Sequence, residues 1–135
     1  MQDAFVRRLH QFANAMVDGE FAAAASWCDT PLTIVRPNGP VVFETHEAVA
    51  ADLALSWNPY AEAGIEAVSP HILEFRCYTH GVSIADVEWR FFDHGGQIRN
   101  TIFSTYSVRQ AEEDLRVSVI IAHNEMRERP SPAPL

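Results

Sequence analysis

The chain has 135 residues, of which 47% are hydrophobic and 21% are charged, an ordinary composition for one globular domain. Its formal net charge of −8 argues against nucleic acids and anionic membrane surfaces as partners, because both are bound through basic patches. All ten cations are arginine, so neither a Schiff base on lysine nor a lysine-dependent phosphate loop is available.

No targeting or membrane-spanning pattern is recognisable in the sequence. The first residues include an acidic side chain and enter an amphipathic pattern directly, and the longest apolar run is far shorter than a bilayer span. We therefore expect a cytoplasmic protein in which Cys28 and Cys77 are reduced rather than bridged.

Residues 3–18 and 20–27 are predicted to form two helices that pack against each other. In the first, apolar residues recur at a spacing of three and four, which gives the helix one buried stripe. Gly19 then stops it. The second helix is short and rich in alanine, with Trp27 on its apolar side.

A small hairpin and a third helix complete the first half. Residues 32–36 and 41–43 form its two strands, joined by the turn sequence Pro-Asn-Gly-Pro. Thr45 caps the third helix, and residues 48–57 carry an apolar face before Pro59 ends it.

The second half is predicted to be an antiparallel meander with no helix between its strands. Pro70 lacks a backbone N–H group and should mark an edge or a bulge in the first strand. The four strands are residues 65–78, 82–93, 98–109 and 115–123, with short joints between them.

The C-terminal residues and the second strand of the meander each show a distinct pattern. Residues 126–135 are rich in proline and charge, which predicts a disordered tail after a single domain of residues 1–125. The second strand of the meander has one apolar face, formed by Ala85, Val87, Trp89 and Phe91, and one mixed face, formed by Ile84, Asp86, Glu88, Arg90 and Phe92.

This arrangement resembles the NTF2-like superfamily, which includes the ketosteroid isomerases, the SnoaL-type polyketide cyclases and scytalone dehydratase. The resemblance covers about residues 3–125. It rests on the helix–Gly19–helix opening, the strand and turn within residues 29–39, the following helix and the terminal meander. It implies a cystatin-like α+β fold, in which a curved mixed or antiparallel sheet wraps the N-terminal helices into a cone with a pocket. It also implies a homodimer through the outer sheet face, which would bear Glu88, Arg90 and Phe92.

The comparison with the ketosteroid isomerases argues against their reaction in this chain. Their general base would fall on Arg36, which cannot accept a proton at working pH, and their tyrosine on Phe12, which has no hydroxyl. Their partner acid would fall near Ser104 or Thr105, again not a carboxylate. The mechanism needs a carboxylate base beside acidic hydrogen-bond donors, so it is not supported.

His123 and Tyr106 are the candidate catalytic residues. His123 is in phase with Leu115, Val117, Val119 and Ile121, so the core face could carry it to the pocket mouth. Tyr106 is in phase with Ser104 and could place its hydroxyl in the same space. The alternatives are a strand-end histidine bonded to the backbone and a core tyrosine with its tip in water.

Candidate ligand-binding residues surround these two. Arg36, at a strand end, could clamp a carboxylate in a bidentate way or pair with Asp29 or Asp86. The other candidates are aromatic or small polar side chains, a type that more often belongs to a core: Phe12, Trp27, Trp57, Tyr60, Trp89 and Ser104.

We expect neither a metal nor a cofactor. His46 and Glu47 begin like a zinc-protease helix, but the second histidine is missing at the required spacing. The sequence contains no GxSxG motif, phosphate loop or dinucleotide fingerprint, and Cys28 has no histidine at local spacing.

Two classes of function remain open. In the first, the chain binds a small apolar or aromatic ligand, anionic or not, and as an alternative works as a SnoaL- or scytalone-dehydratase-like lyase or isomerase through His123 and Tyr106. In the second, it is a non-catalytic dimeric assembly module whose cavity is plugged by side chains such as Phe12. Polar groups among apolar neighbours at the expected pocket positions favour the first class.

Overall fold

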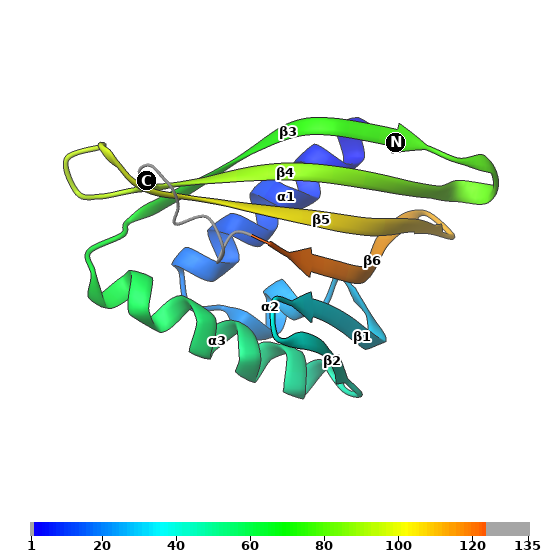
Figure 1. Ribbon diagram of the computed structural model, residues 1–135, viewed down its shortest axis with the longest axis horizontal. Coiled ribbons are helices and arrows are strands. Elements are labelled where there is room, and N and C mark those ends of the chain that lie inside the picture. Colours follow the sequence, from blue (N-terminus) through cyan, green and yellow to red (C-terminus); the bar gives the residue numbers. More distant parts are fainter. Residues whose placement is uncertain (1, 124–135) are drawn as a thin grey trace.

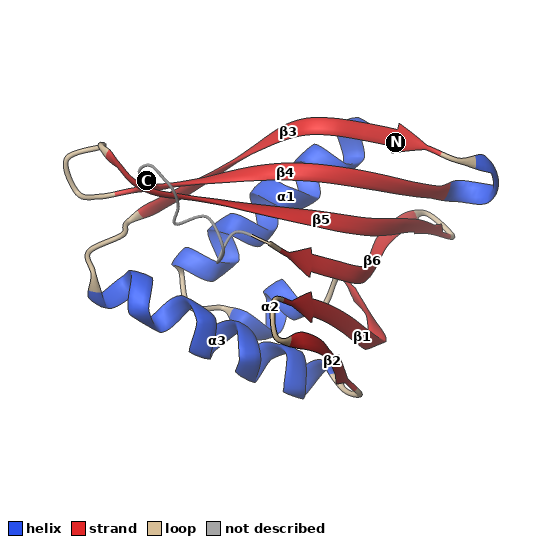
Figure 2. Cartoon of the chain, viewed as in Figure 1, coloured by secondary structure: helices blue, strands red, loops and turns tan. Residues whose placement is uncertain are grey.

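A computed structural model describes residues 2–123 of the chain, so the predicted tail at residues 126–135 lies outside the described residues. Three α-helices, a short 3-10 helix and six strands make up this part (Figure 2), which confirms the α+β class. In chain order they are α1 (Gln2–Val17), α2 (Phe21–Ala25), β1 (Cys28–Arg36), β2 (Gly39–Phe43), α3 (His46–Glu62), β3 (Ala67–Cys77), η1 (Thr79–Gly81), β4 (Val82–Phe92), β5 (Ile98–Ala111) and β6 (Asp114–Ala122).

The strands form one mixed sheet in the order β2-β1-β6-β5-β4-β3. The predicted meander is correct for β3 to β6, whose neighbours pair antiparallel. The pair β1–β6 is parallel and joins the early hairpin to the end of the meander. Figure 1 shows α1 crossing the long strands obliquely and α3 lying beside β1 and β2, so the helices gather at one face of the sheet.

The predicted stripe of α1 forms the centre of the core. Phe5 and Leu9 are fully buried, and Ala13 is 2% exposed. The Phe5 ring lies 5.5 Å from that of Phe75 on β3 and 6.2 Å from that of Tyr106 on β5. These contacts hold α1 against the inner face of the sheet and fix the space that remains beside it.

The two largest differences between the predicted and observed element boundaries have tertiary reasons. Strand β1 begins at Cys28, four residues earlier than expected, because Cys28 pairs with Val117 of β6 across an irregular register. Helix α3 continues past Pro59 to Glu62. Its last turn is held by packing, since the Tyr60 ring lies 4.5 Å from that of Phe91 on β4.

Pro70 behaves as predicted. It lies in β3, which is an edge strand of the sheet. The register irregularity of this strand falls further along, between Ile72 and Glu74.

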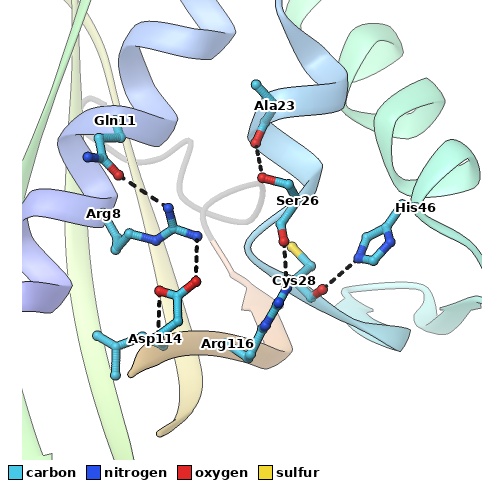
Figure 3. A network of polar contacts seen from close by, with 9 residues as sticks. Arg8, Gln11, Ala23, Ser26, Cys28, His46, Asp114 and Arg116 are labelled. Carbon is cyan, nitrogen blue, oxygen red and sulfur yellow. Dashed lines mark hydrogen bonds and ion pairs between the residues drawn. The ribbon is translucent and has the colours of Figure 1, made fainter. Parts of the chain in front are cut away.

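Polar contacts tie the helices to the strands at one end of the cone (Figure 3). Arg8 of α1 forms an ion pair with Asp114 of β6 at 3.7 Å. Arg116 donates to the carbonyl oxygen of Ser26 at 2.7 Å, and a ring nitrogen of His46 lies 2.8 Å from the carbonyl oxygen of Cys28. His46 therefore has a structural partner at the start of α3.

None of the helices within residues 2–123 has the length and apolar character needed to cross a membrane.

Candidate ligand cavity

A cavity of about 310 Å³ lies between α1, α3 and the inner face of the sheet. Its apolar wall comes from both helices and from strands β1, β3, β4, β5 and β6. The wall residues are Phe12, Ala13, Met16, Ile34, Leu53, Trp57, Tyr60, Val68, Trp89, Phe91, Ile102, Ile120 and Ala122.

The floor of this cavity carries a buried phenol. Tyr106 is 4% exposed, and its hydroxyl accepts a hydrogen bond from the indole N–H of Trp89 at 3.0 Å. Burial raises the pKa of Tyr106 to about 12, although hydrogen bonds with Trp89 and Ser104 oppose part of that rise. The floor therefore presents a neutral hydroxyl at any pH near 7.

The rim of the cavity carries an ion pair. Nη2 of Arg36 lies 2.6 Å from Oδ2 of Asp52 on α3, and their side chains are 29% and 17% exposed. The guanidinium also lies 6.0 Å from the centre of the Phe43 ring, within cation–π range.

The predicted partners of Arg36, Asp29 and Asp86, are wrong. Asp29 is held by Arg109 at 2.6 and 2.7 Å, and Asp86 accepts from Thr105 at 2.6 Å. The end of β1 faces α3 instead, so a carboxylate on that helix reaches Arg36 first.

Sequence reasoning missed Asp52 and Ser56, which both line the cavity. A signal was present: Asp52 follows the buried Val49 by three residues and precedes Ser56 by four, so all three share one side of α3. Asp52 and Ser56 border the apolar stripe of α3 that ends at Trp57.

His123 is not brought together with Tyr106. Val117 pairs with Val108 and Val119 with the adjacent Ser107, so β6 contains one extra residue and its alternation is reversed. After this bulge, Ile120 and Ala122 line the cavity. The expectation that His123 continues the face of Leu115 and Val117 is therefore wrong.

On the outer face, His123 belongs to a different group of side chains. Its Nε2 lies 3.2 Å from the hydroxyl of Thr105, which donates to Asp86, and its backbone N–H donates to the carbonyl oxygen of Phe103 at 3.4 Å. Since the Thr105 proton is used toward Asp86, Nε2 of His123 is the donor in this chain of hydrogen bonds.

Trp27 is also outside the cavity wall. It is 3% exposed and its ring lies 6.0 Å from that of Phe5 and 5.7 Å from that of Phe12. It borders a second, more polar cleft between α1 and α2. Seven of the predicted residues do lie on the cavity wall, and their role in binding stays a prediction: Phe12, Arg36, Trp57, Tyr60, Trp89, Ser104 and Tyr106.

Two other kinds of site find no support in the part of the chain that the structure describes. No three His, Cys, Asp or Glu side chains of residues 2–123 gather in a way that could hold a metal ion. Burial raises the pKa of the Cys28 thiol to about 12, so it is not a thiolate nucleophile near neutral pH.

Comparisons with known proteins agree with this architecture. Residues 2–125 match a family model described as NTF2-like protein (DUF6841). A comparison with curated proteins finds no match.

Solved structures extend the comparison at low sequence identity. A cystatin-like domain of unknown function from Nostoc punctiforme has 13% identity and a TM-score of 0.72, over 91% of this chain and 76% of that chain. An NTF2-like protein of unknown function from Shewanella oneidensis has 14% identity and a TM-score of 0.70, over 90% and 98%. A protein from Catenulispora acidiphila in complex with S-DNPA has 11% identity and a TM-score of 0.68, over 94% and 95%. At these identities the likeness establishes the fold alone.

Proposed function

The chain belongs to the NTF2-like protein family (DUF6841), and we propose that it binds a small, ring-containing, mainly apolar ligand inside the cone. The observation that carries this proposal is the cavity of about 310 Å³, whose wall is mainly aromatic and aliphatic. Small-molecule sites typically combine such a wall with a few polar groups that fix orientation. Here those groups are the Tyr106 hydroxyl at the floor and the Arg36–Asp52 pair at the rim.

Support also comes from a structural neighbour, the Catenulispora acidiphila protein described in complex with S-DNPA. The proposal itself rests on this chain's own cavity. An aromatic ligand would lie beside the indoles of Trp57 and Trp89, so its binding should change the tryptophan fluorescence.

Filling the cavity tests the proposal. A panel of naphthalene derivatives is titrated against wild type and Ala122→Phe, with tryptophan fluorescence and NMR chemical shifts as readouts. Ala122 lines the cavity, so the larger side chain should abolish binding while circular dichroism and melting temperature show a folded protein. Ala61→Phe, at an exposed position of α3, is the matched control and should bind like wild type. Equal binding by wild type and Ala122→Phe would refute a ligand site in this cavity.

A second candidate function, proton transfer in a lyase or isomerase, is favoured by one observation. Asp52 is a carboxylate on the wall that also carries the Tyr106 phenol. Asp52 would take a proton from the carbon next to a ligand carbonyl, Tyr106 would donate a hydrogen bond to the resulting enolate oxygen, and the proton would return to carbon. His123 has no part in this version because it lies on the outer face.

Deuterium exchange of 2-tetralone in D₂O, followed by NMR, tests this second function. Proton transfer by Asp52 predicts exchange faster than in buffer, and Asp52→Asn should slow it by about 10²-fold or more. Exchange at the buffer rate, or an Asp52→Asn variant as fast as wild type, would leave ligand binding as the function.

A further inference from the structure

The charged side chains that line the cavity within residues 2–123 lie at its rim. Among the described residues that line it, Arg36 and Asp52 alone are charged, and they neutralise each other at 2.6 Å. The floor offers the phenol of Tyr106 and the hydroxyl of Ser104, with no cation near them on the wall. Within residues 2–123, the cavity therefore offers a ligand anion no uncompensated positive charge.

Among the described residues, one hydrogen bond engages the side chains of the rim pair. A guanidinium has five N–H donors and a carboxylate has two acceptor oxygens. Nη2 of Arg36 donates a hydrogen bond to Oδ2 of Asp52. Among the described residues that line the cavity, this is the one hydrogen bond between charged side chains. Adjacent donors and acceptors thus remain at the rim, which suits a hydroxyl or an amide because each of these groups both donates and accepts.

A carboxylate fits this rim poorly. To contact Arg36 it must lie beside Asp52, and two like charges in a partly water-excluded site repel each other. The formal net charge of −8 on the whole chain adds a repulsive long-range field. The sequence suggested that Arg36 binds an anionic ligand. Its ion pair with Asp52 neutralises the positive charge that such binding requires.

We propose that the ligand of this cavity is a neutral ring compound, with an acceptor oxygen at Tyr106 and a hydroxyl or amide at the rim. Asp52 is the residue that determines this specificity, because its negative charge neutralises Arg36 and repels a ligand carboxylate. The inference rests on the proposed function, since it concerns which ligand the same cavity takes.

A matched pair of probes separates charge from shape. 2-Naphthamide and 2-naphthoate have the same ring and a similar planar head, but the acid is ionised at neutral pH because carboxyl groups titrate near pH 4. Wild type should bind the amide roughly tenfold or more tightly than the carboxylate, as expected for a like-charge contact. Dissociation constants come from tryptophan fluorescence and are checked by isothermal titration calorimetry.

Three variants test whether the rim residues cause the preference for 2-naphthamide over 2-naphthoate. Asp52→Asn keeps the shape and frees Arg36, so the preference should reverse toward 2-naphthoate. Adding Arg36→Met to Asp52→Asn should remove that gain. Glu74→Gln is the matched control, because Glu74 forms an exposed ion pair with Arg76 at 3.0 Å outside the cavity. It should keep the wild-type ratio of the two dissociation constants.

The outcomes test the neutral-ligand inference separately from the proposed function on which it rests. Wild type that binds 2-naphthoate as tightly as the amide, or an Asp52→Asn variant with an unchanged ratio, overturns the neutral-ligand inference and leaves the cavity a ligand site. Binding of neither probe to wild type or to any variant contradicts both the inference and the proposed ring-binding function.

Discussion

At the scale of single residues, Tyr106 and Trp89 decide the chemistry of the cavity floor. Trp89 is 4% exposed, so its indole N–H has little access to water, and the Tyr106 oxygen is its acceptor at 3.0 Å. A buried donor that loses its acceptor keeps the full cost of its desolvation. The pair is therefore a structural element as well as a candidate site.

Tyr106→Phe should lower the free energy of unfolding by about 1–3 kcal/mol, because the Trp89 N–H then has no acceptor. A double-mutant cycle with Trp89→Phe, measured by urea unfolding, checks this. The double variant should be more stable than the sum of the two single effects predicts. Strict additivity would show that the two groups are not energetically coupled.

Cys28 and Tyr106 should make the fold sensitive to alkali. Burial raises the pKa of the Cys28 thiol from 9.0 to about 12 and that of Tyr106 from 10.0 to about 12. Groups whose pKa is raised by folding contribute stability that is complete below the unfolded pKa and is lost as pH rises through the folded value. The affected window is thus about pH 9 to 12.

In that window the free energy of unfolding should fall by up to about 1.4 kcal/mol per pH unit for each group. Urea unfolding at pH 7, 9 and 10 measures the slope. Cys28→Ala should show a shallower fall between pH 9 and 10 than wild type, whatever its stability at pH 7. Parallel curves would contradict a buried thiol as the cause.

At the scale of elements, the bulge in β6 determines which side chains face the cavity. The extra residue is Ser118, and its hydroxyl donates to Asp29 of β1 at 2.7 Å. Arg109 of β5 holds the same carboxylate with two hydrogen bonds. Three adjacent strands are therefore linked at the point where the alternation of β6 reverses.

Asp29→Asn should lower the urea midpoint at pH 7, because the hydrogen bonds from Arg109 and Ser118 hold the pKa of Asp29 below its usual range. A carboxyl whose pKa is lowered by folding adds stability above its unfolded pKa, and this stability is lost as pH falls through the folded value. The difference between wild type and variant should accordingly shrink on acidification from pH 7 toward pH 3. Glu74→Gln serves as the control, and a gap that stays constant with pH would rule out Asp29 as the titrating group.

At the scale of the whole molecule, the two faces of the sheet differ in composition. The inner face of β4 is apolar as predicted, since Ala85 and Val87 are fully buried and Phe91 is 5% exposed. The outer face carries the bonded pair Glu88–Arg90 and the Asp86–Thr105–His123 chain among apolar side chains. Ile121 on this face is 39% exposed.

We propose that two copies associate through this outer face. The assembly-module alternative also requires a cavity plugged by side chains, whereas Phe12 lines a cavity of about 310 Å³. Ile121→Asp should convert a dimer into a monomer, because it places a charge where apolar side chains would meet. Light scattering after gel filtration measures the mass. Leu55→Asp, at a 71% exposed position on α3, is the control and should leave the mass unchanged. A wild-type monomer at all accessible concentrations would refute the proposed homodimer.

Local patterns predicted much of this fold because they repeat within one segment. The stripe of α1, the alternation of β4 and the in-phase placement of Tyr106 with Ser104 each depend on one period within one element. The path of α3 past Pro59 was mispredicted because its last turn is stabilised by Phe91, a residue distant in the sequence.

The sequence by itself determined the α+β class, the inner faces of α1, β4 and β5, and the exclusion of lysine chemistry. Only the tertiary structure decided that Asp52 neutralises Arg36 and that His123 lies outside the cone. The ion pair joins residues 16 apart on different elements. The side occupied by His123 depends on a bulge that is defined by pairing with β5. The periodicity of a strand or a helix predicts neither the Arg36–Asp52 ion pair nor the position of His123. Both depend on contacts between segments that are distant in the sequence.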